Sequence, residues 1–218
     1  MQKINFIKSK YIFSNKPIKR LNNVKNKTEL LKKLKLKIEN VENCELKKNA
    51  KNLVFSSGDH NSSLMLVGEG PGQREDEMGI PFVGDAGKLL DKMLKAINID
   101  RNKTYVTNVV NYRPPNNRKP NQSEINFYSP FLMEHISIIN PKIIILLGSC
   151  AMETFFGDKT KISNMRGHWK NIIINNRSYL AMVTFHPAYL LRQADQKKKS
   201  WIDLKEIKKK INEFKISI

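Results

Sequence analysis

Cysteine is nearly absent from this chain, which carries only Cys44 and Cys150 among its 218 residues. Two cysteines exclude the disulfide framework of a small secreted domain, and alone they cannot complete a four-cysteine metal site. The amino terminus also lacks the apolar stretch of a secretion signal. No apolar run approaches the roughly 20 residues that a membrane-spanning helix needs. The sequence therefore predicts a protein of a reducing compartment, and we expect a cytoplasmic location.

Acidic residues are also scarce, since 20 Asp and Glu stand against 39 Lys and Arg and leave a formal net charge of +19. Such an excess suits a polyanionic partner, and nucleic acid is the first candidate. Lysine, asparagine and isoleucine are abundant throughout, which is typical of AT-rich coding, so part of the charge has that alternative origin. We expect DNA rather than a membrane as the partner, and a monomer as the active form.

Apolar residues make up 40% of the chain, which is enough for a core, and predicted strands alternate with predicted helices. The strands are expected at 64–67, 104–110, 142–147, 169–174 and 178–185. Helical periodicity predicts helices at 28–40, 84–97, 123–139, 150–156 and 200–214. This order predicts an α/β fold, a three-layer αβα sandwich around a central, largely parallel four-stranded sheet.

Residues 1–27 are polar, basic and without a clear period, so we expect a basic N-terminal extension before a single domain at 28–218. The extension is either a flexible arm or an electrostatic tether to DNA. Thr28 is the expected N-cap of the first helix. That helix has ordinary amphipathic packing as its first interpretation, although basic amphipathic helices also lie on membrane surfaces.

The densest glycine cluster follows the first predicted strand. Gly68-Glu-Gly-Pro-Gly72 ends an apolar run, and Gly79-Ile-Pro-Phe-Val-Gly84 follows shortly after. Glycine lets a backbone approach a ligand closely, and ligands of open α/β sheets bind beyond the carboxyl ends of strands. Phosphate binding is the simplest function for such a loop. The alternative is a tight turn in which Glu69 is a solvated acid.

Three polar residues interrupt the apolar pattern where predicted strands meet loops, and they are Glu69, Asn108 and His186. The carboxyl ends of parallel strands share one edge of a sheet, so the three side chains are expected in one pocket. An amide can read a hydrogen-bonding edge, an imidazole can stabilise a leaving group, and a carboxylate can hold water. Singly, Asn108 is more often a structural cap and His186 more often a satisfied core or turn histidine; together they favour a site.

Phe82 and a basic loop extend this pattern. Phe82 lies between glycines and is either a core residue or a flat face on which a base can stack. Arg113, Arg118 and Lys119 lie on a proline-rich loop and suit phosphate groups, unless the loop is simply solvated.

Four motifs, taken in order, resemble the uracil-DNA glycosylase superfamily, specifically the family-4 enzymes that usually carry an iron–sulfur cluster. They lie within about residues 44–214 and are Gly68-Glu-Gly-Pro-Gly72 with Glu75-Asp76, Gly79-Ile-Pro-Phe-Val-Gly84, Thr107-Asn-Val-Val110 with Arg113-Pro-Pro115, and His186-Pro-Ala-Tyr-Leu-Leu-Arg192. Their order and spacing are more specific than any single glycine loop. The resemblance implies a monofunctional DNA glycosylase that flips deoxyuridine out of DNA, releases uracil and starts base-excision repair.

The resemblance also implies roles for the pocket residues. Glu69, beside the Gly70 backbone, would position the attacking water and stabilise positive charge on the sugar. His186 would stabilise the negative charge on the departing uracil, so these two side chains are the expected catalytic residues.

Uracil itself would be held by three further side chains and by Gly70. Phe82 would stack on the ring, and Asn108 would hydrogen-bond its pairing edge. Glu75 would lie against the C5 edge and exclude the methyl group of thymine.

The expected DNA contacts lie around this pocket. Arg113 and Arg118 are expected to bind phosphate groups. Leu190, Leu191 and Arg192 resemble the segment that enters the DNA where the base has left.

The cluster ligands are where the chain departs from the family. The resemblance implies four cysteines; Cys44 matches the second, whereas Val41, Asn111 and Tyr128 occupy the other positions. Cys150 lies in a later helix and does not substitute for any of them. One thiolate cannot hold a 4Fe–4S cluster, so we expect no cofactor and no metal. The family's clusters tie the amino-terminal segment to the loop after the second strand, and the hypothesis is that Val41 and Tyr128 replace this tie by apolar contact.

Two other functions stay open. The chain could be a DNA-binding relict that lost catalysis together with the cluster, which salt-sensitive DNA binding without base release would indicate. It could also be a glycosylase for another deaminated base, which a panel of damaged bases would decide.

Overall fold

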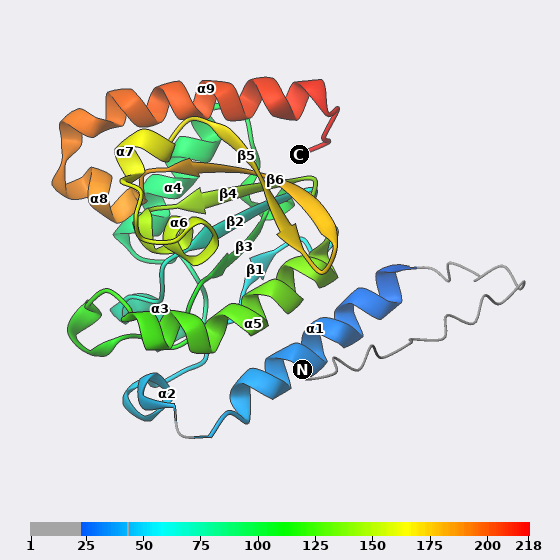
Figure 1. The fold of residues 1–218 in the computed structure, drawn as a ribbon, viewed down its shortest axis with the longest axis vertical. Helices are drawn as coiled ribbons and strands as arrows, with labels where there is room; N and C mark the ends of the chain where they lie inside the picture. The colour runs from blue at the N-terminus through cyan, green and yellow to red at the C-terminus, as the bar shows by residue number, and fades with distance from the viewer. Residues whose placement is uncertain (1–22, 43) are drawn as a thin grey trace, which may run out of the picture.

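The computed structural model describes residues 23–42 and 44–218 (Figure 1). The helices are α1 (Asn23–Glu39), α2 (Glu45–Asn49), α3 (Gln73–Met78), α4 (Asp85–Ala96), α5 (Gln122–Ile139), α6 (Ser149–Phe156), α7 (Ile162–Met165), α8 (Pro187–Arg192) and α9 (Lys197–Glu213). The strands are β1 (Ser57–Gly58), β2 (Leu64–Gly68), β3 (Tyr105–Asn108), β4 (Ile143–Leu147), β5 (Trp169–Ile174) and β6 (Arg177–Thr184). Short 3-10 helices occur at Arg101–Lys103, Pro115–Asn117 and Ala194–Gln196.

The strands form one sheet in the order β1-β3-β2-β4-β6-β5. The inner strands β3, β2, β4 and β6 are mutually parallel, and they are the four-stranded parallel sheet that the sequence predicts. The edge strands β1 and β5 pair antiparallel with β3 and β6, so the described sheet has six strands rather than four. The predicted α/β class is confirmed, and the expected strand count describes only the parallel part.

Helices cover both faces of this sheet, because successive side chains of its buried strands point to opposite sides. Met65 and Val67 of β2 pack in a core cluster with residues of α1, α5 and α6. Leu64 and Leu66 pack in a second cluster with residues of α4 and α9. Figure 1 shows α9 along one side of the sheet and α1 and α5 along the other. The arrangement is the predicted αβα sandwich.

The parallel register brings the carboxyl ends of the inner strands to one edge. Gly68 at the end of β2 is opposite Asn108 at the end of β3, and Leu147 of β4 is opposite Thr184 of β6. The glycine loop after β2 and the segment that begins at Phe185 therefore leave the sheet on the same side. This edge positions the candidate site.

Several element boundaries differ from the predicted ones. Helix α1 begins at Asn23, five residues before the predicted N-cap Thr28, and residues 1–22 of the expected extension lie outside the described residues. The strand predicted at 104–110 ends at Asn108, because the next two residues donate their backbone N–H groups to Gly68 and Glu69 in the loop after β2. Among the described helices, none is long and apolar enough to cross a membrane.

Candidate active site

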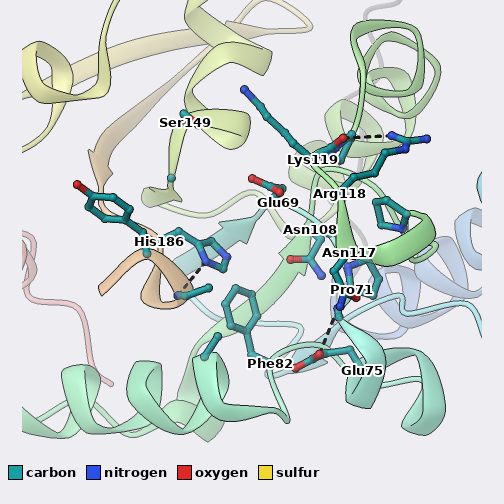
Figure 2. A pocket seen from close by; sticks show the side chains of 18 of the residues that line it. Glu69, Pro71, Glu75, Phe82, Asn108, Asn117, Arg118, Lys119, Ser149 and His186 are labelled. Carbon is teal, nitrogen blue, oxygen red and sulfur yellow. Dashed lines mark hydrogen bonds between the residues drawn. The ribbon is translucent and has the colours of Figure 1, made fainter. Parts of the chain in front are cut away.

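A cavity of about 600 Å³ opens where β2, β3 and β6 end (Figure 2). Eight of the residues that the sequence predicts for the site line it, namely Glu69, Gly70, Glu75, Phe82, Asn108, Arg118, His186 and Arg192. Their side chains come from separate loops and strand ends, and Figure 2 shows Glu69, Asn108, Phe82 and His186 around a common space. The three polar strand-end residues thus do converge.

Two buried polar atoms in this cavity have no hydrogen-bond partner within the described chain, Asn108 Oδ1 and His186 Nε2. The Asn108 side chain is only 3% exposed, so water outside the protein does not solvate it freely. An unsatisfied buried polar group costs about 1–3 kcal/mol. The pair therefore indicates a ligand that offers polar groups to an amide oxygen and to an imidazole nitrogen at once.

The backbone of α8 fixes the proton position of His186. His186 is the N-cap of this helix, and its Nδ1 accepts a hydrogen bond from the Ala188 N–H at 3.2 Å. A neutral imidazole with an acceptor at Nδ1 carries its proton on Nε2, the unpartnered atom. Burial lowers the pKa of His186 to about 4, with a further contribution from Arg192. At neutral pH the ring is therefore an uncharged donor that faces the cavity.

Gly148 makes this placement of His186 possible. A Cβ atom at Gly148 would lie 2.9 Å from the His186 Cβ, and the backbone there has a φ of +92°, which disfavours other residues. The Gly148 N–H also donates to the carbonyl oxygen of Thr184 at 2.9 Å, which closes β4 against the end of β6.

Glu69 lies half-buried on the cavity wall, among charges of both signs. Burial raises the pKa of its carboxyl, Lys119 and Arg192 lower it, and Glu153 raises it. Lys119 also forms an ion pair with Glu153, with 2.5 Å between Nζ and the carboxylate oxygen. Glu69 is therefore a carboxyl group whose ionisation lies closer to neutral pH than usual, which suits a proton acceptor.

Phe82 is held beneath the cavity in an unusual backbone conformation. Its φ is +57°, which side-chain-bearing residues rarely adopt, so the surrounding structure must enforce it. Close packing does so, because a Cβ at Gly87 would lie 1.8 Å from the Phe82 carbonyl oxygen and one at Gly68 would lie 2.6 Å from the ring. The ring lies 5.6 Å from the imidazole of His186, centroid to centroid, and Arg101 lies over it.

The carboxylate of Glu75 holds the loop that carries Phe82. Its Oε1 accepts from the backbone N–H groups of Val83 at 2.9 Å and Gly84 at 2.7 Å, and its Oε2 accepts from Gly72 at 3.2 Å. The side chain is 9% exposed and lines the cavity. Sequence reasoning missed this anchoring because the six-residue helix α3, which contains Glu75, is too short to show a period.

Two basic residues of the loop at the rim already form hydrogen bonds with neighbouring side chains. Arg118 donates two hydrogen bonds to Glu124, at 2.8 and 2.6 Å, and Arg113 donates from Nε to Asn117 at 2.8 Å. Arg113 does not line the cavity, whereas Arg118, Lys119 and Asn117 do. Arg113 and Arg118 remain predicted phosphate ligands.

The structure corrects one member of the predicted DNA-entering segment. Leu190 is only 1% exposed and packs in the core cluster between the sheet, α4 and α9, so it is not available to enter DNA. The neighbouring Leu191 is 48% exposed, and Arg192 is also exposed. The difference arises because the helix α8 directs one leucine towards the core and the next towards solvent. The sequence analysis predicted no helix in this segment, so it could not distinguish the two leucines.

Comparison with known proteins decides the family. A model of the uracil DNA glycosylase superfamily matches residues 55–205, which include the pocket from β2 to α8. This chain belongs to that superfamily. A type-4 uracil-DNA glycosylase of Thermotoga maritima is 39% identical over 165 residues, covering 75% of this chain and 84% of the relative. Those of Pyrobaculum aerophilum and Sulfurisphaera tokodaii are 39% and 38% identical, covering 75% and 82% of this chain and 85% and 83% of the relatives.

Behind the glycosylase pocket, a buried ion pair that the sequence did not suggest supports the end of β6. Asp203 of α9 is fully buried and accepts from the Thr184 hydroxyl at 2.6 Å and from Arg166 Nε at 3.1 Å. Arg166 also binds the carbonyl oxygen of Lys199 and lies over the ring of Phe185. Thr184 is two residues before His186, so this network holds the end of the strand from which the segment with the imidazole continues. Its signal in the sequence was an aspartate on the apolar face of the last helix.

The residues at the family's cluster positions do not match the chemistry of a 4Fe–4S cluster. Cys44 supplies the one thiol, Tyr128 a phenol, Asn111 an amide and Val41 no donor at all. Burial raises the pKa of the Tyr128 phenol far above its usual range, so the oxygen keeps its proton. Within the described ranges, no three His, Cys, Asp or Glu side chains are grouped as a metal site would require.

Proposed function

We propose that this chain is a uracil-DNA glycosylase, which hydrolyses the bond between uracil and deoxyribose in DNA and starts base-excision repair. The observation that carries the proposal is a pair of buried atoms in one cavity beside Phe82, Asn108 Oδ1 and His186 Nε2, for which residues 23–42 and 44–218 supply no hydrogen-bond partner. The three type-4 uracil-DNA glycosylases at 38–39% identity support the same activity.

Asn108 suits the pairing edge of uracil. Its Oδ1 accepts from the uracil N3–H, and its Nδ2 donates to the O4 carbonyl oxygen. Cytosine presents an acceptor at N3 and a donor at C4, so the same amide would face mismatched groups. A site built to hydrogen-bond one pattern rejects the other strongly, because its buried polar groups would stay unpaired. Phe82 offers its ring to the face of the base.

His186 and Glu69 divide the chemistry. The bond between the sugar C1′ and uracil N1 breaks, and its electron pair moves onto the uracil ring. His186 stabilises this anion by donating the Nε2 hydrogen, and the backbone bond at Nδ1 fixes its direction. A water oxygen bonds to C1′ and transfers a proton to Glu69, and the uracil anion takes a proton from solvent. The ionised Glu69 also stabilises positive charge on the sugar.

Glu75 serves two purposes in this proposal. Its carboxylate anchors the loop that carries Phe82, and the carbon atoms of its side chain face the C5 edge of the base. A methyl group at C5, as in thymine, would then meet a side chain that three hydrogen bonds hold in place.

DNA is the proposed substrate, and the flipped nucleotide enters from the rim that Arg118 and Arg192 line. Leu191 is the exposed side chain proposed to occupy the space that the base leaves, and Arg113 and Arg118 are proposed to bind phosphates. We further propose that the enzyme works without a 4Fe–4S cluster, because one thiol among the four ligand positions cannot hold one. The monomeric state and the cytoplasmic location stay predictions.

The test is release of free uracil from an oligonucleotide with one deoxyuridine, in single-stranded and double-stranded form. The proposal expects uracil and an abasic site in equal amounts, and no release from matched thymine or cytosine substrates. Salt-sensitive DNA binding without release of any base would favour the inactive DNA-binding alternative. Release of hypoxanthine or another deaminated base in preference to uracil would favour the second alternative.

A further inference from the structure

The four cluster positions of the family lie on three separate parts of this chain. Val41 and Cys44 lie beside α2, Asn111 follows β3, and Tyr128 is on α5. A metal cluster at these positions would join the three parts covalently. In this chain, other interactions must therefore hold the three parts together.

Cys44 and Tyr128 make the first of these interactions. The distance between Cys44 Sγ and the Tyr128 hydroxyl is 3.1 Å, and the two residues are 84 positions apart in the sequence. Both are buried, Tyr128 at 1% exposure, and both belong to the same core cluster, against which Val41 also packs. The hydrogen bond thus crosses the buried apolar core between the start of α2 and the middle of α5.

Asn111 makes the second interaction. Its Nδ2 donates to the Val54 carbonyl oxygen at 3.1 Å, and the Val54 N–H donates to the Asn111 carbonyl oxygen at 2.9 Å. Both residues are buried, so neither bond competes with bulk water. This pair holds the segment after α2 against the loop that leaves β3.

Asp76 extends the same segment to the pocket. The backbone N–H groups of Lys51 and Asn52 donate to Asp76 Oδ1 at 2.8 and 3.1 Å, and the Asn52 amide donates to the Asp76 carbonyl oxygen at 2.8 Å. Asp76 is in α3 beside Glu75. Residues 44–54 are therefore bound to α5, to the loop after β3 and to the helix that anchors the Phe82 loop.

We infer that the thiol–phenol contact of Cys44 and Tyr128, together with the Asn111–Val54 pair, does the joining that a 4Fe–4S cluster does in the family, and so holds the pocket wall without metal. The loop after β3 continues from Asn111 to Pro114 and Asn117, which line the cavity. The inference rests on membership of the family, not on the proposed catalysis, and its tests do not require activity.

The first test is a double-variant cycle of thermal unfolding with Cys44→Ala and Tyr128→Phe. Cys44→Ala leaves a buried hydroxyl without its partner, whereas the double variant removes both hydrogen-bonding groups. The Tm loss of the double variant is expected to fall short of the sum of the single losses by about 2–4 °C. A Tm loss of the double variant equal to the sum of the two single losses would contradict a stabilising contact between Cys44 and Tyr128.

The second test locates the effect by amide hydrogen exchange. Tyr128→Phe is expected to speed exchange in residues 45–54 about fivefold and to leave α9 unchanged. Tyr179→Phe is the matched control, because Tyr179 is also buried in the same core cluster but bonds only weakly to Asn140. Equal effects of the two variants on residues 45–54 would contradict the inference.

The third test is metal content. The wild-type chain, produced with added iron and cysteine and purified without oxygen, is expected to lack stoichiometric iron, acid-labile sulfide and visible absorbance. Iron and sulfide at the level of a full cluster would overturn the inference outright, whatever the unfolding data show.

Discussion

Glu75→Gln separates two roles of one side chain, the anchoring of the Phe82 loop and the exclusion of thymine. Glutamine has the size of glutamate, so a role that depends only on shape would survive the change. The anchoring role would not, because glutamine carries no charge and directs an NH₂ group where the carboxylate accepted a hydrogen bond.

The structure sets the size of the expected loss. Glu75 accepts three backbone hydrogen bonds, from Val83, Gly84 and Gly72. Hydrogen bonds to a charged group are worth about 1.5–3 kcal/mol, and the amide retains only one oxygen for this purpose. We therefore expect a loss of about 2 kcal/mol in unfolding free energy, which lowers the Tm of a chain of this size by about 4–8 °C.

The assay combines thermal unfolding with uracil release, and Glu77→Gln is the matched control. Glu77 belongs to the same helix α3 but is exposed, and within the described residues its carboxylate accepts a hydrogen bond from Gln73 alone. We expect Glu75→Gln to reduce kcat/KM for uracil because Phe82 loses its fixed position. Wild-type stability and wild-type uracil release in Glu75→Gln would refute the anchoring argument and leave only the contact with the base.

Three further predictions concern the charge at Glu69, the DNA contact and the support of His186. Burial already raises the Glu69 pKa, so kcat/KM should fall as the pH drops through that pKa. Lys119 lowers this pKa and Glu153 raises it, so in pH profiles of kcat/KM the acid limb should move to higher pH in Lys119→Ala and to lower pH in Glu153→Gln. An unmoved limb would exclude Glu69 as the titrating group. Leu191→Ala should reduce release from double-stranded but not single-stranded DNA, since only a duplex leaves a gap to fill; an equal loss on both would argue against insertion. Asp203→Asn should lower kcat more than it raises KM, and no surface substitution should restore the lost activity. An unchanged kcat would mean that the network serves stability alone.

The sequence was sufficient for the architecture and for the pocket. Apolar runs with flanking helical periods predict the parallel strands and the two helical layers, because both follow from local periodicity. The polar residues Glu69, Asn108 and His186 could be placed in one cavity because the carboxyl ends of parallel strands share an edge. Neither argument needs the tertiary structure.

What the sequence could not supply depends on contacts between distant residues. The two-residue strand β1 and the six-residue helices α3 and α8 are too short to show a period. Leu190 and Leu191 are adjacent leucines, and the sequence does not distinguish them. Their positions on the helix α8 make the first buried and the second exposed. The hydrogen bond of Cys44 to Tyr128 joins residues 84 positions apart, where the sequence suggested only apolar contact.

The most direct test of the central claim is the rate of uracil release by Asn108→Ala and His186→Ala at saturating enzyme. Ser200→Ala is the control, because Ser200 Oγ is also buried, has no hydrogen-bond partner among the described residues, and lies outside the cavity. Removal of one preorganised polar group from such a site typically reduces the rate by about 100- to 1,000-fold. The account predicts losses of this size for both pocket variants and none for the control. Wild-type release by either pocket variant would contradict it.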